Sequence, residues 1–209
     1  MLPVGEIQRI LKSYELDASI SLAEKISAYV ELILAWNRRI SLTSIKDPKE
    51  IVQYHFVESF LGANIAGPLE GRLADVGTGA GFPGLALKLY VPSVVVTLIE
   101  PNAKKCAFLG EVVRKLDLQG VEICRSRFED FAVEAKFDAI SSRALGNLAE
   151  FLSWGAKATK SGGKALLWLG AEGVEEAQVA GTEWQWREPY AIPETRRRFI
   201  LIGTRIPEV

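Results

Sequence analysis

The residues best suited to chemistry lie in a glycine-rich segment from Asp75 to Gly84, which reads DVGTGAGFPG. An apolar run precedes the segment and a helical pattern follows it, which is the context of a nucleotide-binding loop. Glycines allow sharp turns and let a ligand approach the backbone without meeting a Cβ atom. The first amide groups of a helix have no intrahelical partner, so they can hold a carboxylate or a phosphate. The segment therefore predicts a site for an anionic cofactor.

Two cofactors fit this segment. The spacing Gly-x-Gly-x-x-Gly from Gly79 to Gly84 satisfies the dinucleotide fingerprint, and Glu100 ends the next apolar run, where a ribose-binding acid belongs. Since S-adenosylmethionine (SAM) also contains adenosine, Glu100 fits the ribose of either NAD or SAM. Asp75, two residues before Gly77, adds the Asp-x-Gly-x-Gly pattern of SAM-dependent methyltransferases, and its carboxylate can receive the methionine ammonium group. The pattern favours SAM, and an NAD-dependent oxidoreductase stays open as an alternative.

Three residues farther along the chain lie at or just after the ends of later apolar runs. Phe128 and Glu129 follow the third run, and Arg143 ends the fourth. In a parallel sheet these positions share the carboxyl edge, where ligands bind. Glu129 can accept a hydrogen bond from an adenine amino group or cap a solvated helix, and Phe128 can pack against the adenine ring. Arg143 lies beside the expected position of the reacting methyl group, as a clamp for the substrate or as an ion-pair partner.

The elements that must position these residues begin at residue 72. We expect strands at 73–76, 94–99, 121–124, 137–141 and 165–169, with helices near 84–90, 102–116 and 148–158. This alternation predicts a parallel sheet covered by helices on both faces. Two further strands, 184–190 and 199–206, are joined by a connection too short for a crossover helix, so they should be antiparallel. A mostly parallel seven-stranded α/β sheet ending in an antiparallel hairpin is the Rossmann-like layout of class I SAM-dependent methyltransferases.

Residues 1–66 have a helical pattern throughout. Ser21 and Glu24 predict a capping box, and Asp47 followed by Pro48 predicts a second helix start. Glycine and proline at 67–71 interrupt the pattern. We therefore expect an N-terminal helical extension at 1–66, packed on a SAM-binding domain at 67–209.

Composition limits the range of functions. The 209 residues carry 25 Lys and Arg against 26 Asp and Glu, so binding to RNA would depend on local patches. Cys106, Cys124 and His55 have no metal-ligand spacing, and we expect no metal. No apolar run is long enough to cross a bilayer, and no signal peptide is evident at the start. The chain is expected to be cytoplasmic and monomeric.

Taken together, these residues resemble the glucose-inhibited division protein B (RsmG) family, the bacterial small-subunit ribosomal RNA guanine-N7 methyltransferases. The similarity runs from about residue 36 to 202. The matching segments are Trp36-Asn37, Leu42-Thr43, His55, Glu58-Ser59, Asp75 to Gly84, Lys104-Lys105, Phe108-Leu109, Ser126-Arg127-x-Glu129, Phe137-Asp138 and Ser142-Arg143-Ala144. The Gly-Phe-Pro-Gly end of the glycine segment and the Ser-Arg-Ala triplet are far more specific than the glycines alone.

The resemblance implies an enzyme that uses SAM, yields S-adenosylhomocysteine and acts on 16S rRNA within the small subunit. With the loop residues included, the expected cofactor contacts are Asp75, Gly77, Gly79, Gly81, Phe82, Glu100, Asn102, Phe128, Glu129 and Arg143. Asn37, His55, Ser59 and Arg143 are the expected catalytic residues, and Arg196, Arg197 and Arg198 are expected to contact RNA.

One position departs from the family pattern. The family usually has Lys-Gly at the end of the fifth strand, and this chain has Leu169-Gly170. The missing charge leaves a noncatalytic SAM-binding module open as an alternative, although the arginines at 196–198 can supply charge instead. Arg197 aligns best with the arginine in the family's C-terminal region.

The implied reaction needs no general base. N7 of guanine has a lone pair in the plane of the ring, so no proton has to be removed before it attacks the sulfonium methyl group. Catalysis then depends on aligning nucleophile, methyl carbon and sulfur, with water excluded. An acceptor base stacked in RNA would have to be splayed out.

Overall fold

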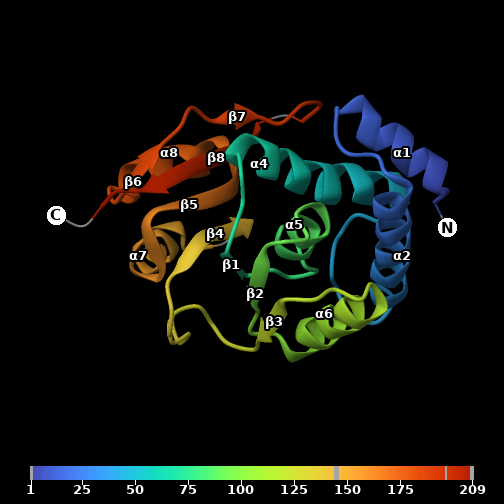
Figure 1. Cartoon of the computed structure of the whole chain (residues 1–209), viewed down its shortest axis with the longest axis horizontal. Coiled ribbons are helices and arrows are strands. Elements are labelled where there is room, and N and C mark those ends of the chain that lie inside the picture. The colour runs from blue at the N-terminus through green and yellow to red at the C-terminus, as the bar shows by residue number, and fades with distance from the viewer. Residues whose placement is uncertain (1, 144–145, 196, 208–209) are drawn as a thin grey trace.

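The computed structural model describes residues 2–143, 146–195 and 197–207, and its centre is a mixed β-sheet (Figure 1). The strand order is β3-β2-β1-β4-β5-β8-β6, and the short strand β7 also pairs with β8. The strands are β1 (Arg72–Val76), β2 (Val95–Ile99), β3 (Val121–Cys124), β4 (Phe137–Arg143), β5 (Thr159–Gly170), β6 (Trp184–Trp186), β7 (Tyr190–Ala191) and β8 (Arg198–Arg205). Strands β1 to β5 are parallel to one another, and β8 is antiparallel to β5 and β6, as the sequence predicts.

Helices cover both faces of the sheet. They are α1 (Val4–Ser13), α2 (Ile20–Trp36), α3 (Pro48–Ile51), the π-helix η1 (Val52–Val57), α4 (Glu58–Ala66), α5 (Gly84–Tyr90), α6 (Ala103–Lys115), α7 (Leu148–Ala158) and α8 (Ala171–Ala180). Side chains alternate along each strand, so Leu73 joins the core beneath α2, α4, α5 and α6, while Ala74 joins the core beneath α7 and α8. The helices of residues 4–66 therefore share one hydrophobic core with a face of the sheet.

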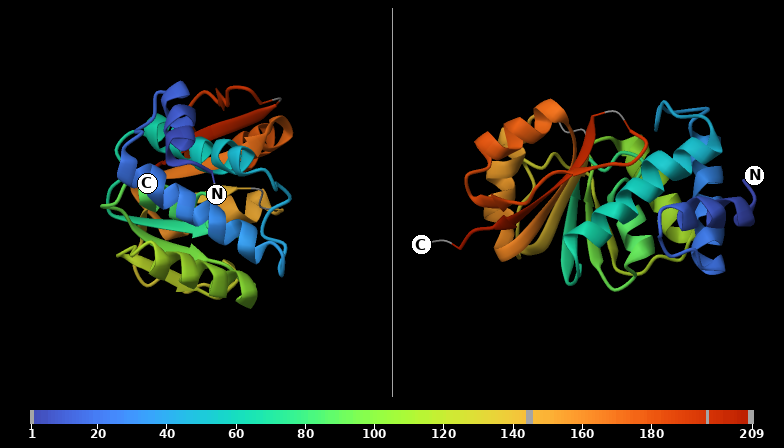
Figure 2. Two further views of the ribbon diagram at one scale, coloured as in Figure 1. Left: turned by 90° about the vertical axis from the view of Figure 1, so that its right-hand side faces the viewer. Right: turned by 90° about the horizontal axis from the view of Figure 1, so that it is seen from above.

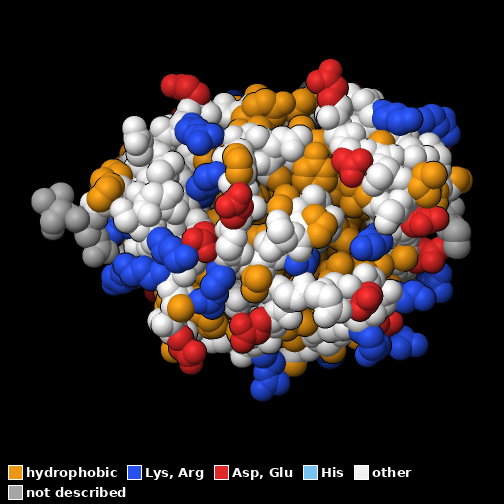
Figure 3. All heavy atoms as spheres, viewed as in Figure 1, with side chains coloured by type: hydrophobic (Ala, Val, Ile, Leu, Met, Phe, Trp, Pro, Cys, Tyr) orange, Lys and Arg blue, Asp and Glu red, His pale blue; other side chains and the backbone are white. Residues whose placement is uncertain are grey.

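Helices α1 and α2 lie at the end of the molecule opposite β6, whereas α4 reaches across to β8 (Figure 2). On the face seen in Figure 3, Lys and Arg side chains alternate with Asp and Glu side chains instead of forming one basic surface. This distribution agrees with the nearly balanced charge of the sequence.

Two sequence predictions need correction, and one helix was not predicted. The N-cap of α2 is Ser19, whose side chain accepts a hydrogen bond from the amide of Leu22, so the capping box predicted at Ser21 is wrong. The strand predicted at 184–190 is broken into β6 and β7, and the register against β8 shifts by one residue between them. Pro189 has no amide hydrogen to donate there. Helix α8 was not predicted, because it buries only Val174 and Ala177 and has little apolar periodicity.

Candidate active site

A cavity of about 340 Å³ lies at the carboxyl ends of β1 and β2, where the glycine-rich segment leaves the sheet. The residues that line it are Val76, Gly77, Ile99, Glu100, Pro101, Lys105, Ser126, Arg127, Phe128, Glu129 and Gly146. The backbone of the segment is left-handed at Gly77, Gly79 and Gly81, with φ of 67°, 58° and 86°. These conformations are strained for residues with a Cβ atom, which explains the glycines. We call this space the cofactor cavity.

Glu100 connects the end of β2 to the glycine loop. One oxygen of its buried carboxylate accepts a hydrogen bond of 3.0 Å from the amide of Gly79. The other oxygen accepts a bond of 2.9 Å from the amide of Asn102, and Asn102 itself caps α6 through the amides of Lys104 and Lys105. The carboxylate therefore shapes the loop and also lines the cofactor cavity.

Asp75 supports the loop from beneath. Its side chain is fully buried, and its two oxygens accept hydrogen bonds from the amide of Gly84 at 2.9 Å and the hydroxyl of Ser141 at 2.7 Å. Burial raises the pKa of Asp75 to about 6, although both hydrogen bonds oppose the rise. Asp75 thus ties the start of α5 to β4, and its predicted contact with the methionine ammonium group stays untested.

Phe82 belongs to an aromatic cluster rather than to the surface of the cofactor cavity. Its ring is 2% exposed, stacks on Tyr29 at 5.4 Å between centroids and lies 4.8 Å from the ring of His55. The hydroxyl of Tyr29 donates to the carbonyl of Ala80 at 2.7 Å, and a Cβ atom added to Gly81 would lie only 2.1 Å from that hydroxyl. Helix α2 therefore fixes the glycine loop through Tyr29.

His55 lies in the π-helix η1 and is buried. Its Nε2 lies 3.0 Å from the hydroxyl of Thr43, whereas Nδ1 has no hydrogen-bond partner among the residues the structure describes. Burial lowers the pKa of His55 to about 3, and the positive charge of Arg143 contributes to the shift. The imidazole is therefore neutral at neutral pH.

Asn37 and Ser59, also predicted as catalytic residues, form hydrogen bonds within the N-terminal helical region. Asn37 ends α2 and accepts hydrogen bonds from the amides of Leu42 and Thr43, so it orders the loop that carries Thr43 to His55. Ser59 is buried and donates to the carbonyl of His55 at 2.6 Å. Both residues thus act on the position of His55.

Arg143 lies beside a second cavity. This cavity of about 320 Å³ is lined by Arg143, Leu148, Trp168, Leu169, Gly170, Gly173, Glu176, Ile192, Arg198 and Phe199. Arg143 donates a hydrogen bond of 3.1 Å to the carbonyl of Tyr54, and its guanidinium lies 5.4 Å from the centroid of Phe82. Gly146 lines the cofactor cavity, and Arg143 and Leu148 line the second.

The predicted RNA-binding arginines differ in their surroundings. Arg196 lies outside the described residues. Arg197 is exposed in a left-handed conformation, with φ of 61°. Arg198 lines the second cavity and forms an ion pair of 2.6 Å with Glu58. Burial raises the pKa of Glu58 to about 7, against the attraction of Arg198 and Arg143.

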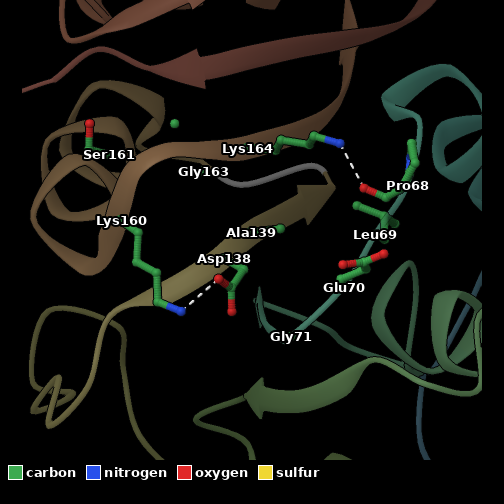
Figure 4. Close-up of a pocket in the computed structure, with 11 residues that line it drawn as sticks. Pro68, Leu69, Glu70, Gly71, Asp138, Ala139, Lys160, Ser161, Gly163 and Lys164 are labelled. Carbon is green, nitrogen blue, oxygen red and sulfur yellow. Dashed lines mark hydrogen bonds and ion pairs between the residues drawn. The ribbon is translucent and has the colours of Figure 1, made fainter.

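A larger cavity of about 530 Å³ lies at the opposite edge of the sheet (Figure 4). It opens between the segment 68–71 that leads into β1 and the segment 160–164 of β5, which are joined by a hydrogen bond of 2.7 Å from Lys164 to the carbonyl of Pro68. Lys160 pairs with Asp138 of β4 at 2.6 Å in its lining. None of its lining residues comes from the glycine loop. Since ligands of open α/β sheets bind at the carboxyl ends of the strands, size alone does not make it the cofactor site.

Comparison with known proteins identifies the family. The model of the family described as rRNA small subunit methyltransferase G (GidB) matches residues 22–199. The chain belongs to this family. The methyltransferase G of Desulfitobacterium hafniense (strain Y51) is 40% identical over 191 residues, covering 89% of this chain and 72% of that protein. That of Roseiflexus castenholzii is 35% identical over 214 residues, covering 97% and 92%.

Solved structures confirm the class I methyltransferase fold. A methyltransferase from Pyrococcus furiosus superposes with a TM-score of 0.62 at 17% identity, over 87% of this chain and 98% of that chain. The glycopeptide N-methyltransferase MtfA complexed with S-adenosyl-L-homocysteine superposes with a TM-score of 0.61 at 13% identity, over 73% and 90%. Membership of the GidB family favours SAM over the NAD alternative.

Several residues around the two cavities have contacts that the sequence did not predict. Tyr29, Tyr54 and Ser141 carry no local signal, because their partners lie 51 to 89 residues away in the chain. Glu58 had a signal, since it is a charged residue among the apolar positions of a helical pattern.

Within residues 2–143, 146–195 and 197–207, no three His, Cys, Asp or Glu side chains group as metal ligands. No helix of the same residues is long and apolar enough to span a membrane.

Proposed function

We propose that this chain transfers the methyl group of SAM to N7 of a specific guanine in 16S ribosomal RNA. The observation that carries the proposal is the cofactor cavity, where the glycine loop and Glu100 meet at the carboxyl edge of the sheet beside Arg143 and the second cavity. Membership of the GidB family supports the choice of ribosomal RNA. In this proposal residues 67–209 are the catalytic domain and residues 1–66 an extension packed on it.

The residues of the cofactor cavity fit SAM. A Cβ atom added to Gly79 would meet nothing closer than the carbonyl of Gly77 at 3.8 Å, so the space above the loop is open for a ligand. Glu100 would accept hydrogen bonds from the ribose hydroxyls, and Glu129 from the adenine amino group. Amides of the loop would face the methionine carboxylate. When bound, SAM would supply a methyl group activated by the sulfonium.

The chain would then act by alignment. N7 of guanine needs no deprotonation, and the neutral, buried His55 is suited to packing and hydrogen bonding rather than to proton transfer. Arg143 would hold oxygen atoms of the cofactor or the RNA at the edge of the site. A cation pressed against the imidazole ring of guanine would oppose the positive charge that develops on methylation, so Arg143 should avoid N7.

The substrate in this proposal is the RNA within the small ribosomal subunit. The net charge of −1 gives the chain little general affinity for naked RNA. A monomeric enzyme in the cytoplasm stays a prediction.

Methyl transfer can be tested directly. SAM with a radiolabelled methyl group, incubated with the protein and small subunits, should label one guanine of 16S rRNA, at N7 when the base is mapped. Titration should show binding of SAM and not of NADH. Binding of SAM without transfer to subunits would instead identify a noncatalytic module.

A further inference from the structure

Glu58 is a buried acid whose charge is only partly compensated. Its side chain is 2% exposed at the start of α4, and one oxygen lies 2.6 Å from Nη2 of Arg198 on β8, whose side chain is 40% exposed. The other oxygen accepts no hydrogen bond from any residue in the described part of the chain. A buried carboxylate loses its hydration, and this loss offsets the attraction to one half-exposed arginine. The fold alone therefore does not explain a glutamate here.

Two arginines of the second cavity are held by the helical stretch that contains Glu58. Arg143 donates to the carbonyl of Tyr54 at 3.1 Å, and the guanidinium of Arg198 lies 5.8 Å from the centroid of the Tyr54 ring. Tyr54 precedes Glu58 by four residues. Trp168, which lines the cavity, donates from its indole nitrogen to the carbonyl of Glu58 at 2.9 Å. Strand β4, strand β5 and strand β8 are thus all tied to one helical segment around this cavity.

The two guanidinium groups repel each other, and Glu58 offsets that repulsion. Burial lowers the pKa of Arg143 to about 10, the negative charge of Glu58 opposes this shift, and the charge of Arg198 adds to it. A pair of guanidinium groups on one cavity suits a phosphate, because each planar group can donate two parallel hydrogen bonds to its oxygens. Without Glu58, Arg198 would be free to turn away from Arg143 toward solvent.

We propose that Glu58 is a positioning residue that holds Arg198 beside Arg143, so that the two arginines bind one phosphate group of the RNA at the second cavity. This inference rests on the proposed function, since the RNA substrate supplies the phosphate. Glu58 acts through Arg198 and does not itself contact the RNA.

The test is a double-mutant cycle in which the KM for small subunits is measured in the methyl-transfer reaction. Glu58→Gln keeps the shape of the side chain and removes its charge, and we expect the KM for small subunits to rise about tenfold while the Kd for SAM stays within about twofold. Arg198→Gln should raise KM by at least as much. The double variant should be no worse than Arg198→Gln alone, because Glu58 acts only through Arg198.

A matched control is available at the opposite edge of the sheet. Asp138 and Lys160 form an ion pair of the same length, 2.6 Å, far from both cavities named above. Asp138→Asn should leave the KM for subunits unchanged even if it lowers the melting temperature. Arg198→Lys, which keeps a charge for Glu58 and loses the planar fork, should recover only part of the affinity. If Glu58→Gln does not fold, Arg198→Lys still tests the proposal through the KM for subunits.

Several outcomes would overturn the inference. A wild-type KM for Glu58→Gln, additive effects in the double variant, or an equal loss of SAM affinity would each show that Glu58 is merely structural. These outcomes presuppose that the wild-type protein methylates subunits. If the wild-type protein transfers no methyl group, the proposed function fails first and the inference fails with it.

Discussion

The carboxylate of Glu100 accepts a hydrogen bond of 3.0 Å from the backbone amide of Gly79. The end of β2 is thereby joined to the left-handed loop, which Tyr29 and Asp75 also hold through the carbonyl of Ala80 and the amide of Gly84. The same carboxylate lines the cofactor cavity, so the residue that shapes the loop is also the one expected to meet the ribose.

Replacing Glu100 should therefore weaken SAM binding in two ways. Glu100→Ala loses the predicted ribose contact and also releases the amides of Gly79 and Asn102. We expect a loss of about 2 kcal/mol, within the range for hydrogen bonds to a charged group, or roughly thirtyfold in Kd by calorimetry. Glu129→Ala, which removes one exposed carboxylate, should cost less. Equal affinity of Glu100→Ala and the wild-type protein would refute the assignment of the cavity.

A substitution at Gly79 tests the same cavity by filling the space that SAM should occupy, without changing any charge. Gly79→Val would place a branched side chain above the loop, so SAM affinity should fall at least about tenfold, or ~1.4 kcal/mol. The backbone at φ 58° adds a folding penalty of roughly 1–2 kcal/mol. Gly162→Val is the matched control, because Gly162 also has a left-handed φ of 76° and open space, but at the opposite edge of the sheet. It should lose stability and keep SAM affinity.

His55 is the only histidine in the sequence, so its ring can be followed by NMR without assignment. Since burial lowers its pKa to about 3, its Cε1 proton should not shift between pH 5 and pH 8. The unfolded chain binds a proton near pH 6.5 and the folded chain does not, so this group destabilises the fold as pH falls from about 6.5 toward 3. In His55→Gln that component should be absent from the acid denaturation profile. A titration midpoint near 6.5 would contradict the burial.

Arg143 should matter for transfer more than for binding of SAM. Arg143→Ala should keep the fold, because the one hydrogen bond it removes is the bond of 3.1 Å to the backbone carbonyl of Tyr54, and Arg143 lines a cavity instead of filling the core. We expect methyl transfer to fall roughly a hundredfold or more, the scale of lost positioning, with most SAM affinity retained. Arg143→Lys should recover only part of the rate, since lysine lacks the planar fork. Normal turnover by Arg143→Ala on subunits would assign it a structural role alone.

Local patterns in the sequence determined the elements and the cofactor loop. Alternating apolar runs predict β1 to β4 within about two residues at either end, and Asp47 with Pro48 predicts the start of α3, where Asp47 caps the amides of Lys49 and Glu50. The glycine segment was recognisable because its strand–loop–helix context is continuous in the chain. Helix α8 was not predicted because its apolar periodicity is weak, and the break between β6 and β7 was not predicted although Pro189 is a local signal for it.

Only the tertiary structure decided what several of the singled-out residues touch. Asp75 is an acid of the cofactor motif by sequence, yet its oxygens bind Gly84 and Ser141 in the folded chain. Phe82 and His55 pack on each other because α2 brings Tyr29, and η1 brings His55 itself, to the loop. The pairing of Glu58 with Arg198 joins residues 140 positions apart. Spacing along the chain carries no information about such contacts, because they arise only when helices and strands distant in sequence bury their surfaces in one core.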